Sequence, residues 1–161
     1  MATTLTLVST VALSTANNTI SFTNIPQTYS DLLILASLRG STTTTTFGVQ
    51  VNGTTVTDVR RFYAGGSSMS FDSFNEHYIN PSNFTSSVFG NTELYFPNYT
   101  DALTKTYMVD SVGENNATEA YMNFSYNLTG STSAITSINL IRTSGDFVQY
   151  SVASLYGISN A

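Results

Sequence analysis

Residues 119–128 read EAYMNFSYNL and carry the clearest structural signal in the chain. Apolar side chains occupy the even-numbered positions from Ala120 to Leu128, and more polar ones occupy the odd-numbered positions from Glu119 to Asn127. An alternation with a period of two is typical of a β-strand with one buried face. The pattern therefore predicts a strand whose even-numbered apolar side chains face a core.

The same period of two recurs along most of the chain, and no helical pattern extends over ten residues or more. Short alternating segments are separated by turn residues at roughly regular spacing, which is typical of an antiparallel sandwich. We therefore expect an all-β, jelly-roll-like antiparallel β-sandwich of about nine or ten strands, built as one domain over residues 1–161. Residues 1–18 are interpreted as an attachment arm or a first strand. The expected strands lie near residues 5–13, 19–25, 31–39, 47–51, 55–63, 92–96, 105–112, 120–128, 134–142 and 147–158.

Three local features refine this fold. Residues 31–39 (DLLILASLR) are apolar on both faces, which predicts a central strand covered from two sides. Asn52-Gly53 predicts a tight type I′ hairpin turn, because both residues tolerate a positive φ. Residues 64–89 are rich in Gly, Ser and Asn and predict a long excursion with one or two short strands.

Composition and charge exclude several classes of partner. The net charge is −5 and only 9% of residues are charged, whereas nucleic acids and anionic membranes are bound through basic patches. No run of about 18 apolar residues is present that would span a bilayer. The chain contains no Cys, which excludes disulfides and thiolate metal ligands.

Candidates for chemistry are few. His77 is the only histidine, so a catalytic triad or an imidazole metal site would have to be built around it, and its neighbours match neither pattern. The ten carboxylates are scattered singly, which does not favour a glycosidase pair. Loop carboxylates at residues 72–76 and 114–119 are the places where calcium could bind, although neither segment has the spacing of a known calcium loop. We predict no enzyme activity, no cofactor and no metal.

Tyrosines and one basic pair are the candidates for surface contacts. Ten Tyr and ten Phe exceed the needs of one modest core, and Tyr suits both protein interfaces and sugar-stacking platforms. Aromatic residues that simply build strands are the alternative explanation. The candidate contact residues are Arg60, Arg61, Tyr63, His77, Tyr78, Tyr99 and Tyr121.

Three segments in this order resemble a family of virion structural proteins from tailed bacteriophages. They are residues 20–39 (ISFTNIPQTYSDLLILASLR), 52–65 (NGTTVTDVRRFYAG) and 135–158 (ITSINLIRTSGDFVQYSVASLYGI). Residues 95–99 (YFPNY) are similar to a further strand-to-turn element of that family. The resemblance spans nearly the whole chain and brings no catalytic residues with it.

The resemblance implies a β-sandwich module on a phage head or tail. Because the chain has no long N-terminal attachment region and no coiled-coil or collagen-like stalk, it favours a capsid decoration (cement) protein that binds the major capsid protein or other virion proteins. A receptor- or carbohydrate-binding module of a head fibre or tail fibre, recognising a host surface glycan, is the alternative. Residues 1–18 and 64–90 are the expected contact elements. Since unpaired strand edges promote aggregation, we expect copies to cover them by forming a homotrimer.

Overall fold

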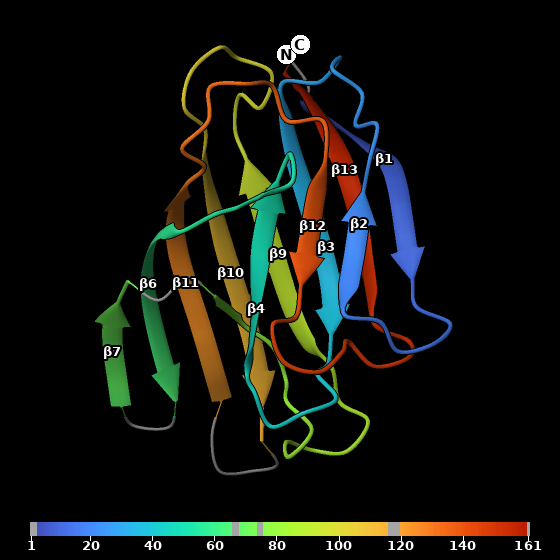
Figure 1. Ribbon diagram of the computed structural model, residues 1–161, viewed down its shortest axis with the longest axis vertical. Coiled ribbons are helices and arrows are strands. Elements are labelled where there is room, and N and C mark those ends of the chain that lie inside the picture. The colour runs from blue at the N-terminus through green and yellow to red at the C-terminus, as the bar shows by residue number, and fades with distance from the viewer. Residues whose placement is uncertain (1–2, 66–67, 74–75, 116–119, 161) are drawn as a thin grey trace.

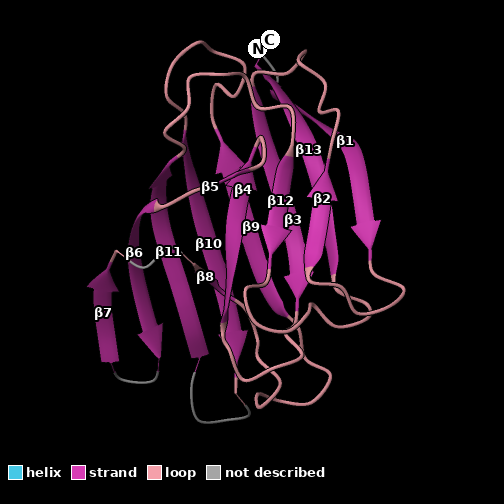
Figure 2. Cartoon of the chain, in the orientation of Figure 1, coloured by secondary structure: helices cyan, strands magenta, loops and turns pink. Residues whose placement is uncertain are grey.

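The computed structural model describes residues 3–65, 68–73, 76–115 and 120–160. These ranges form thirteen strands and no helix, and so contain no helix that could cross a membrane. Two antiparallel sheets lie face to face, which confirms the predicted all-β antiparallel sandwich (Figures 1 and 2). The strands are β1 (Thr3–Ala12), β2 (Thr19–Phe22), β3 (Asp31–Leu38), β4 (Thr46–Val51), β5 (Thr54–Thr55), β6 (Asp58–Gly65), β7 (Ser68–Asp72), β8 (His77–Tyr78), β9 (Gly90–Phe96), β10 (Thr106–Glu114), β11 (Ala120–Leu128), β12 (Ile138–Ile141) and β13 (Val152–Asn160).

The two sheets differ in width. The larger one has eight strands in the order β1-β13-β3-β9-β10-β11-β6-β7, and the smaller one has the order β2-β12-β4-β5, with β8 paired to β4. Figure 1 shows that β6 and β7 extend at one side beyond the smaller sheet, while β1 lies at the opposite side. The two edges of the large sheet are therefore β1 and β7.

One apolar core fills the space between the sheets. The large sheet contributes Leu32, Ile34 and Leu94, which are fully buried, and the small sheet contributes Ile138 and Leu140 opposite them. Burying a side chain of this kind stabilises the fold by about 1.5–3 kcal/mol. This core sits beneath the β13-β3-β9-β10 part of the large sheet, and it fixes which face of those strands turns inward.

Strand β3 is covered on one side only. Its even-numbered residues Leu32 to Leu38 pack into the core, but Leu35 on the other face is 40% exposed. The expectation of a strand covered from two sides is therefore wrong for the isolated chain, although the strand is central in its sheet.

The Asn52-Gly53 turn forms as predicted, with φ of 51° and 79° at the two residues. The return strand differs from the expected residues 55–63. It stops after Thr54–Thr55, and the chain then crosses to the large sheet as β6. Strands β7 and β8 lie within the excursion at residues 64–89, and residues 3–12 are a strand rather than a free arm. The split strands raise the number to thirteen, against the nine or ten expected.

The Asn52 side chain ties this turn to the segment before β12. Its Nδ2 donates to the Ala134 carbonyl at 2.8 Å, and its Oδ1 accepts from the backbone N–H groups of Thr136 at 2.8 Å and Ser137 at 3.1 Å. Asn52 thus combines a left-handed backbone with four side-chain hydrogen bonds to the neighbouring segment at the end of the small sheet.

Two substitutions separate these roles. Asn52→Gly keeps the positive φ and removes the hydrogen bonds, so we expect it to lower the free energy of unfolding by about 1–3 kcal/mol. Asn52→Ala adds the left-handed strain and should cost about 1 kcal/mol more. Urea unfolding measures the stability of both variants, and Thr54→Ala at the exposed neighbouring position is the control. Equal stability of the Gly and Ala variants would contradict the claim that the positive φ at position 52 strains a residue other than Gly or Asn.

Candidate interaction surface

The outer face of the large sheet points away from the small sheet and forms a continuous surface over its eight strands. The strand registers place one side chain of each strand in a row across six strands. From β3 to β7, that row consists of Leu35, Glu93, Asp110, Phe124, Phe62 and Phe71. It is apolar at both ends and acidic in the middle.

Strand β11 buries its polar face and exposes its apolar face. Residues 120–128 form the predicted strand, but the polar residues Asn123, Ser125 and Asn127 are buried, whereas Met122 and Tyr126 are more than half exposed. The expectation that the apolar side chains face the core is therefore wrong. Because side chains alternate along a strand, burying one polar residue turns every apolar neighbour outward.

A buried histidine explains which face of β11 turns inward. His77 on β8 lies inside the sandwich, with Nδ1 at 3.2 Å from Ser125 Oγ and Nε2 at 3.4 Å from the Tyr107 hydroxyl. The Asn127 side chain donates to the Tyr107 carbonyl at 3.1 Å and to Ser125 Oγ at 3.2 Å. Buried polar groups need such partners, and Ser125 and Asn127 on β11 supply them to His77 and Tyr107. The Asn123 amide on the same face is buried without a hydrogen-bond partner among the described residues.

The environment keeps His77 neutral. Burial, with a smaller contribution from the nearby positive charge of Arg61, lowers the pKa of His77 to about 3. Burial also raises the pKa of the Tyr107 hydroxyl. Both groups thus remain uncharged at neutral pH, which suits an interior polar layer rather than acid–base chemistry.

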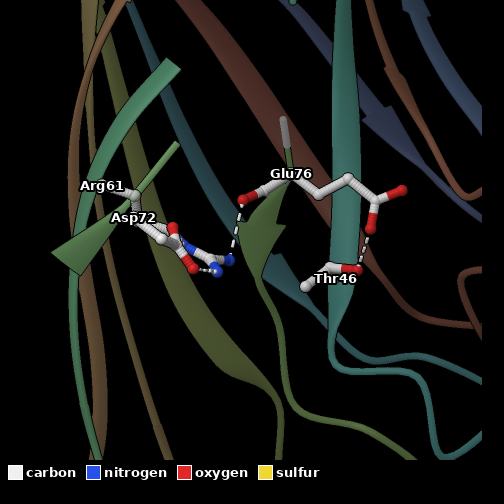
Figure 3. Close-up of polar contacts among 4 residues, drawn as sticks. All are labelled: Thr46, Arg61, Asp72 and Glu76. Carbon is white, nitrogen blue, oxygen red and sulfur yellow. Dashed lines mark hydrogen bonds and ion pairs between the residues drawn. The ribbon is translucent and has the colours of Figure 1, made fainter. Parts of the chain in front are cut away.

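Arg61 anchors the edge of the large sheet. Its guanidinium makes a two-pronged contact with Asp72 on β7, at 3.1 Å and 2.8 Å, and donates to the Glu76 carbonyl at 3.1 Å (Figure 3). The Glu76 carboxylate accepts hydrogen bonds from the hydroxyls of Thr46 on β4 and Thr143. This cluster joins β6 and β7 to the small sheet.

The aromatic rings of Tyr63 and Tyr78 enclose the same guanidinium. The centre of the Arg61 guanidinium lies 4.8 Å from the Tyr63 ring and 5.3 Å from the Tyr78 ring. The two rings stack at 6.0 Å, and Tyr121 continues the stack at 6.4 Å from Tyr78. The three tyrosines are half-buried and support Arg61 instead of forming an open platform.

The polar interior is a poor site for chemistry. Ser125 and His77 resemble part of a nucleophilic pair, but both are fully buried, so a substrate could not reach Ser125. Within the described ranges, no three His, Asp or Glu side chains gather to hold a metal ion. Of the segments considered for calcium, Asp72 is paired with Arg61, and residues 74–75 and 116–119 lie outside the described residues.

A shallow groove of about 800 Å³ runs over the middle of the outer face. Leu35, Val112 and Met122 are among the residues that line it, together with Glu93 and Asp110. The two acids are direct cross-strand partners on β9 and β10, an arrangement that is normally destabilising for like charges. The groove is thus mostly apolar, with one negative spot.

An exposed apolar cluster lies beside the groove, at the β11-β6-β7 end of the sheet. Its side chains are between 38% and 79% exposed, and the registers of β11, β6 and β7 place them on the outer face. We name it the corner patch, which consists of Phe62, Met69, Phe71, Met122, Tyr126 and Leu128.

The candidate contact residues from the sequence differ in exposure and do not form one surface. Arg60 is exposed on the outer face opposite Tyr126, whereas its neighbour Arg61 is buried. His77 and Tyr99 are also buried, and the Tyr99 hydroxyl donates to the Pro26 carbonyl, so none of these three is a surface contact. The expectation of surface roles for them is wrong because each satisfies an interior polar partner.

Sequence reasoning missed the corner patch and the acidic pair. The alternation in residues 68–72 (SMSFD) is typical of a strand with Met69 and Phe71 on one face, and this pattern could have pointed to the β7 part of the patch. Glu93 and Asp110 are distant in sequence and meet only through the β9–β10 register. Comparisons with protein-family models, curated proteins and solved structures found no match.

Replacing His77 tests the interior polar layer. Because the pKa of His77 is about 3 in the folded chain and 6.5 ordinarily, the unfolded chain binds more protons between these values. The stability due to neutral His77 is complete above the unfolded pKa and is lost as the pH falls, by up to about 1.4 kcal/mol per pH unit. Urea unfolding from neutral pH downwards should show a shallower decline for His77→Gln than for the wild type. Parallel declines would contradict the buried neutral ring.

Proposed function

We propose that this chain is a non-enzymatic structural protein of a tailed-phage virion, most specifically a capsid decoration protein on the head surface. The observation that supports this proposal best is the apolar outer face of the large sheet, together with the polar side chains buried beneath it. Monomeric proteins rarely expose apolar patches larger than a few hundred Å². A surface of this kind is typical of a protein that is covered by neighbours in its working state.

Strand β1 is the proposed attachment element. It forms one edge of the large sheet, and Leu5 and Leu7 on it are 51% and 56% exposed. A free edge offers unpaired backbone groups to another protein, and the leucines add apolar area beside them. The low charged fraction of the chain makes such contacts depend little on salt. The binding partner in this proposal is the major capsid protein.

Homo-oligomerisation belongs to the same proposal. No strand in the described ranges covers either edge of the large sheet. With β1 assigned to the capsid contact, a symmetric assembly of copies would cover the β7 edge. We propose a homotrimer, since the threefold and quasi-threefold positions of a capsid lattice suit a subunit of this kind.

A glycan-binding module of a head or tail fibre is the second candidate. The observation that favours it is the groove on the outer face, where the Glu93 and Asp110 carboxylates could accept hydrogen bonds from sugar hydroxyls. The tyrosine stack of Tyr63, Tyr78 and Tyr121 does not line this groove. In this candidate the acids, rather than the tyrosines, would determine binding.

Co-sedimentation with capsids assembled from the cognate major capsid protein alone tests the proposal. We expect saturable binding at a stoichiometry set by the lattice. Leu5→Asp/Leu7→Asp should weaken binding at least about thirtyfold, because it places charge at a desolvated contact. Leu103→Asp is the control, since Leu103 is 69% exposed in the loop between β9 and β10.

The absence of capsid binding by the folded wild-type protein would contradict the decoration role. Adsorption to host-cell glycans instead, reduced by Asp110→Asn, would identify the second candidate.

A further inference from the structure

We infer that the corner patch is the surface through which copies of this chain contact one another. The inference rests on the proposed homo-oligomer and specifies where its interface lies. The occupant of the patch is a second copy of this chain, and four features of the described residues support that choice.

The patch has the area that a stable contact needs. Its six side chains would each contribute roughly 200 Å² if fully exposed, and at their observed exposures they present about 700 Å². A specific protein–protein interface typically buries about 800 Å² on each partner. The patch alone therefore supplies most of one side of an interface between copies.

The charge of the patch suits a copy of the same chain. The net charge of −5 makes two copies repel each other, so a contact between copies is favoured where few acids lie. Among the outer-face side chains of β6, β7 and β11 that the structure describes, Arg60 is the charged group. Asp58, whose side chain lies outside that description, is the register partner of Leu128 at the end of the patch. The acidic pair is not part of the patch but adjoins it, since Asp110 on β10 is the register partner of Phe124 on β11 and the other acid, on β9, lies one strand further away.

The chemistry of the patch disfavours the other partners considered. A sugar requires several polar side chains to bind its hydroxyls, and the patch offers chiefly Phe, Met and Leu. The β1 edge lies at the opposite side of the sheet and remains available to the capsid, whereas the groove shares Met122 with the patch. A contact between copies at the patch is therefore compatible with the decoration role, and it would border the groove of the glycan-binding candidate.

The edge strand of the patch, β7, has one edge without a strand partner in the described ranges and is held in place by β6 on its other side. The contact between Arg61 and Asp72 fixes β7 to β6 beneath Phe71 and Phe62, which lie directly opposite each other. Such preorganisation lowers the entropy cost of association.

Sedimentation equilibrium of the purified chain and two variants tests the inference. Phe71→Lys places a charge on a side chain that is 79% exposed, so the monomer fold should tolerate it, which circular dichroism and thermal melting would verify. We expect a wild-type oligomer and an association constant at least about thirtyfold lower for Phe71→Lys. Leu103→Lys, at a comparably exposed apolar side chain outside the patch, should associate like the wild type.

Two results would overturn the inference. One is a wild type that stays monomeric over the whole concentration range, and the other is a Phe71→Lys variant that associates as strongly as the wild type. Capsid co-sedimentation keeps the two proposals apart. A monomer that binds capsids leaves the decoration role intact and refutes the contact between copies. An oligomer that Phe71→Lys disrupts but that does not bind capsids supports the contact between copies and refutes the decoration role.

Discussion

The contact between the buried His77 ring and Ser125 determines the orientation of half of the large sheet. Strand β8 brings an imidazole into the space between the sheets, and its nitrogens need polar partners there. Ser125 provides one of them, so the odd-numbered side of β11 must face inward. The antiparallel registers then carry this orientation from β11 to β6 and β7, and Phe62 and Phe71 are turned outward.

The large sheet thus consists of two regions with different interiors. Beneath β13, β3 and β9 the interior is apolar and closed by the small sheet. Beneath β11, β6 and β7 it is polar and aromatic, with Arg61 held by Asp72 and enclosed by tyrosines. In this second region His77, Ser125 and Arg61 have polar partners inside the chain, whereas the Asn123 amide and Asn127 Oδ1 are buried without a hydrogen-bond partner among the residues that the structure describes. The apolar side chains on the outer face have no such cover within the described ranges. This division links the fold to the proposed role in an assembly.

Much of the fold could be predicted from alternation and turn residues. The all-β sandwich, the strand at residues 120–128 and the Asn52-Gly53 turn follow from local patterns. A period of two locates a strand but does not say which face is buried, and the usual rule that apolar residues face inward fails for β11. The burial of His77 and Tyr99 depends on partners that are distant in sequence. The corner patch likewise requires the registers of three strands, which the sequence pattern does not contain.

The orientation of β11 is the central claim, and cysteine labelling tests it directly because the natural chain has no Cys. Single substitutions Met122→Cys, Ser125→Cys and Tyr126→Cys would be made in the Phe71→Lys chain, so that contact between copies does not hide the outer face. Their reaction rates with a water-soluble maleimide are then measured under native conditions and compared with the rates in denaturant. We expect rapid labelling at positions 122 and 126 and strong protection at position 125. Protection at 122 and 126 with rapid labelling at 125 would show that the apolar face is buried, and would contradict both the inverted strand and the interaction surface built on it.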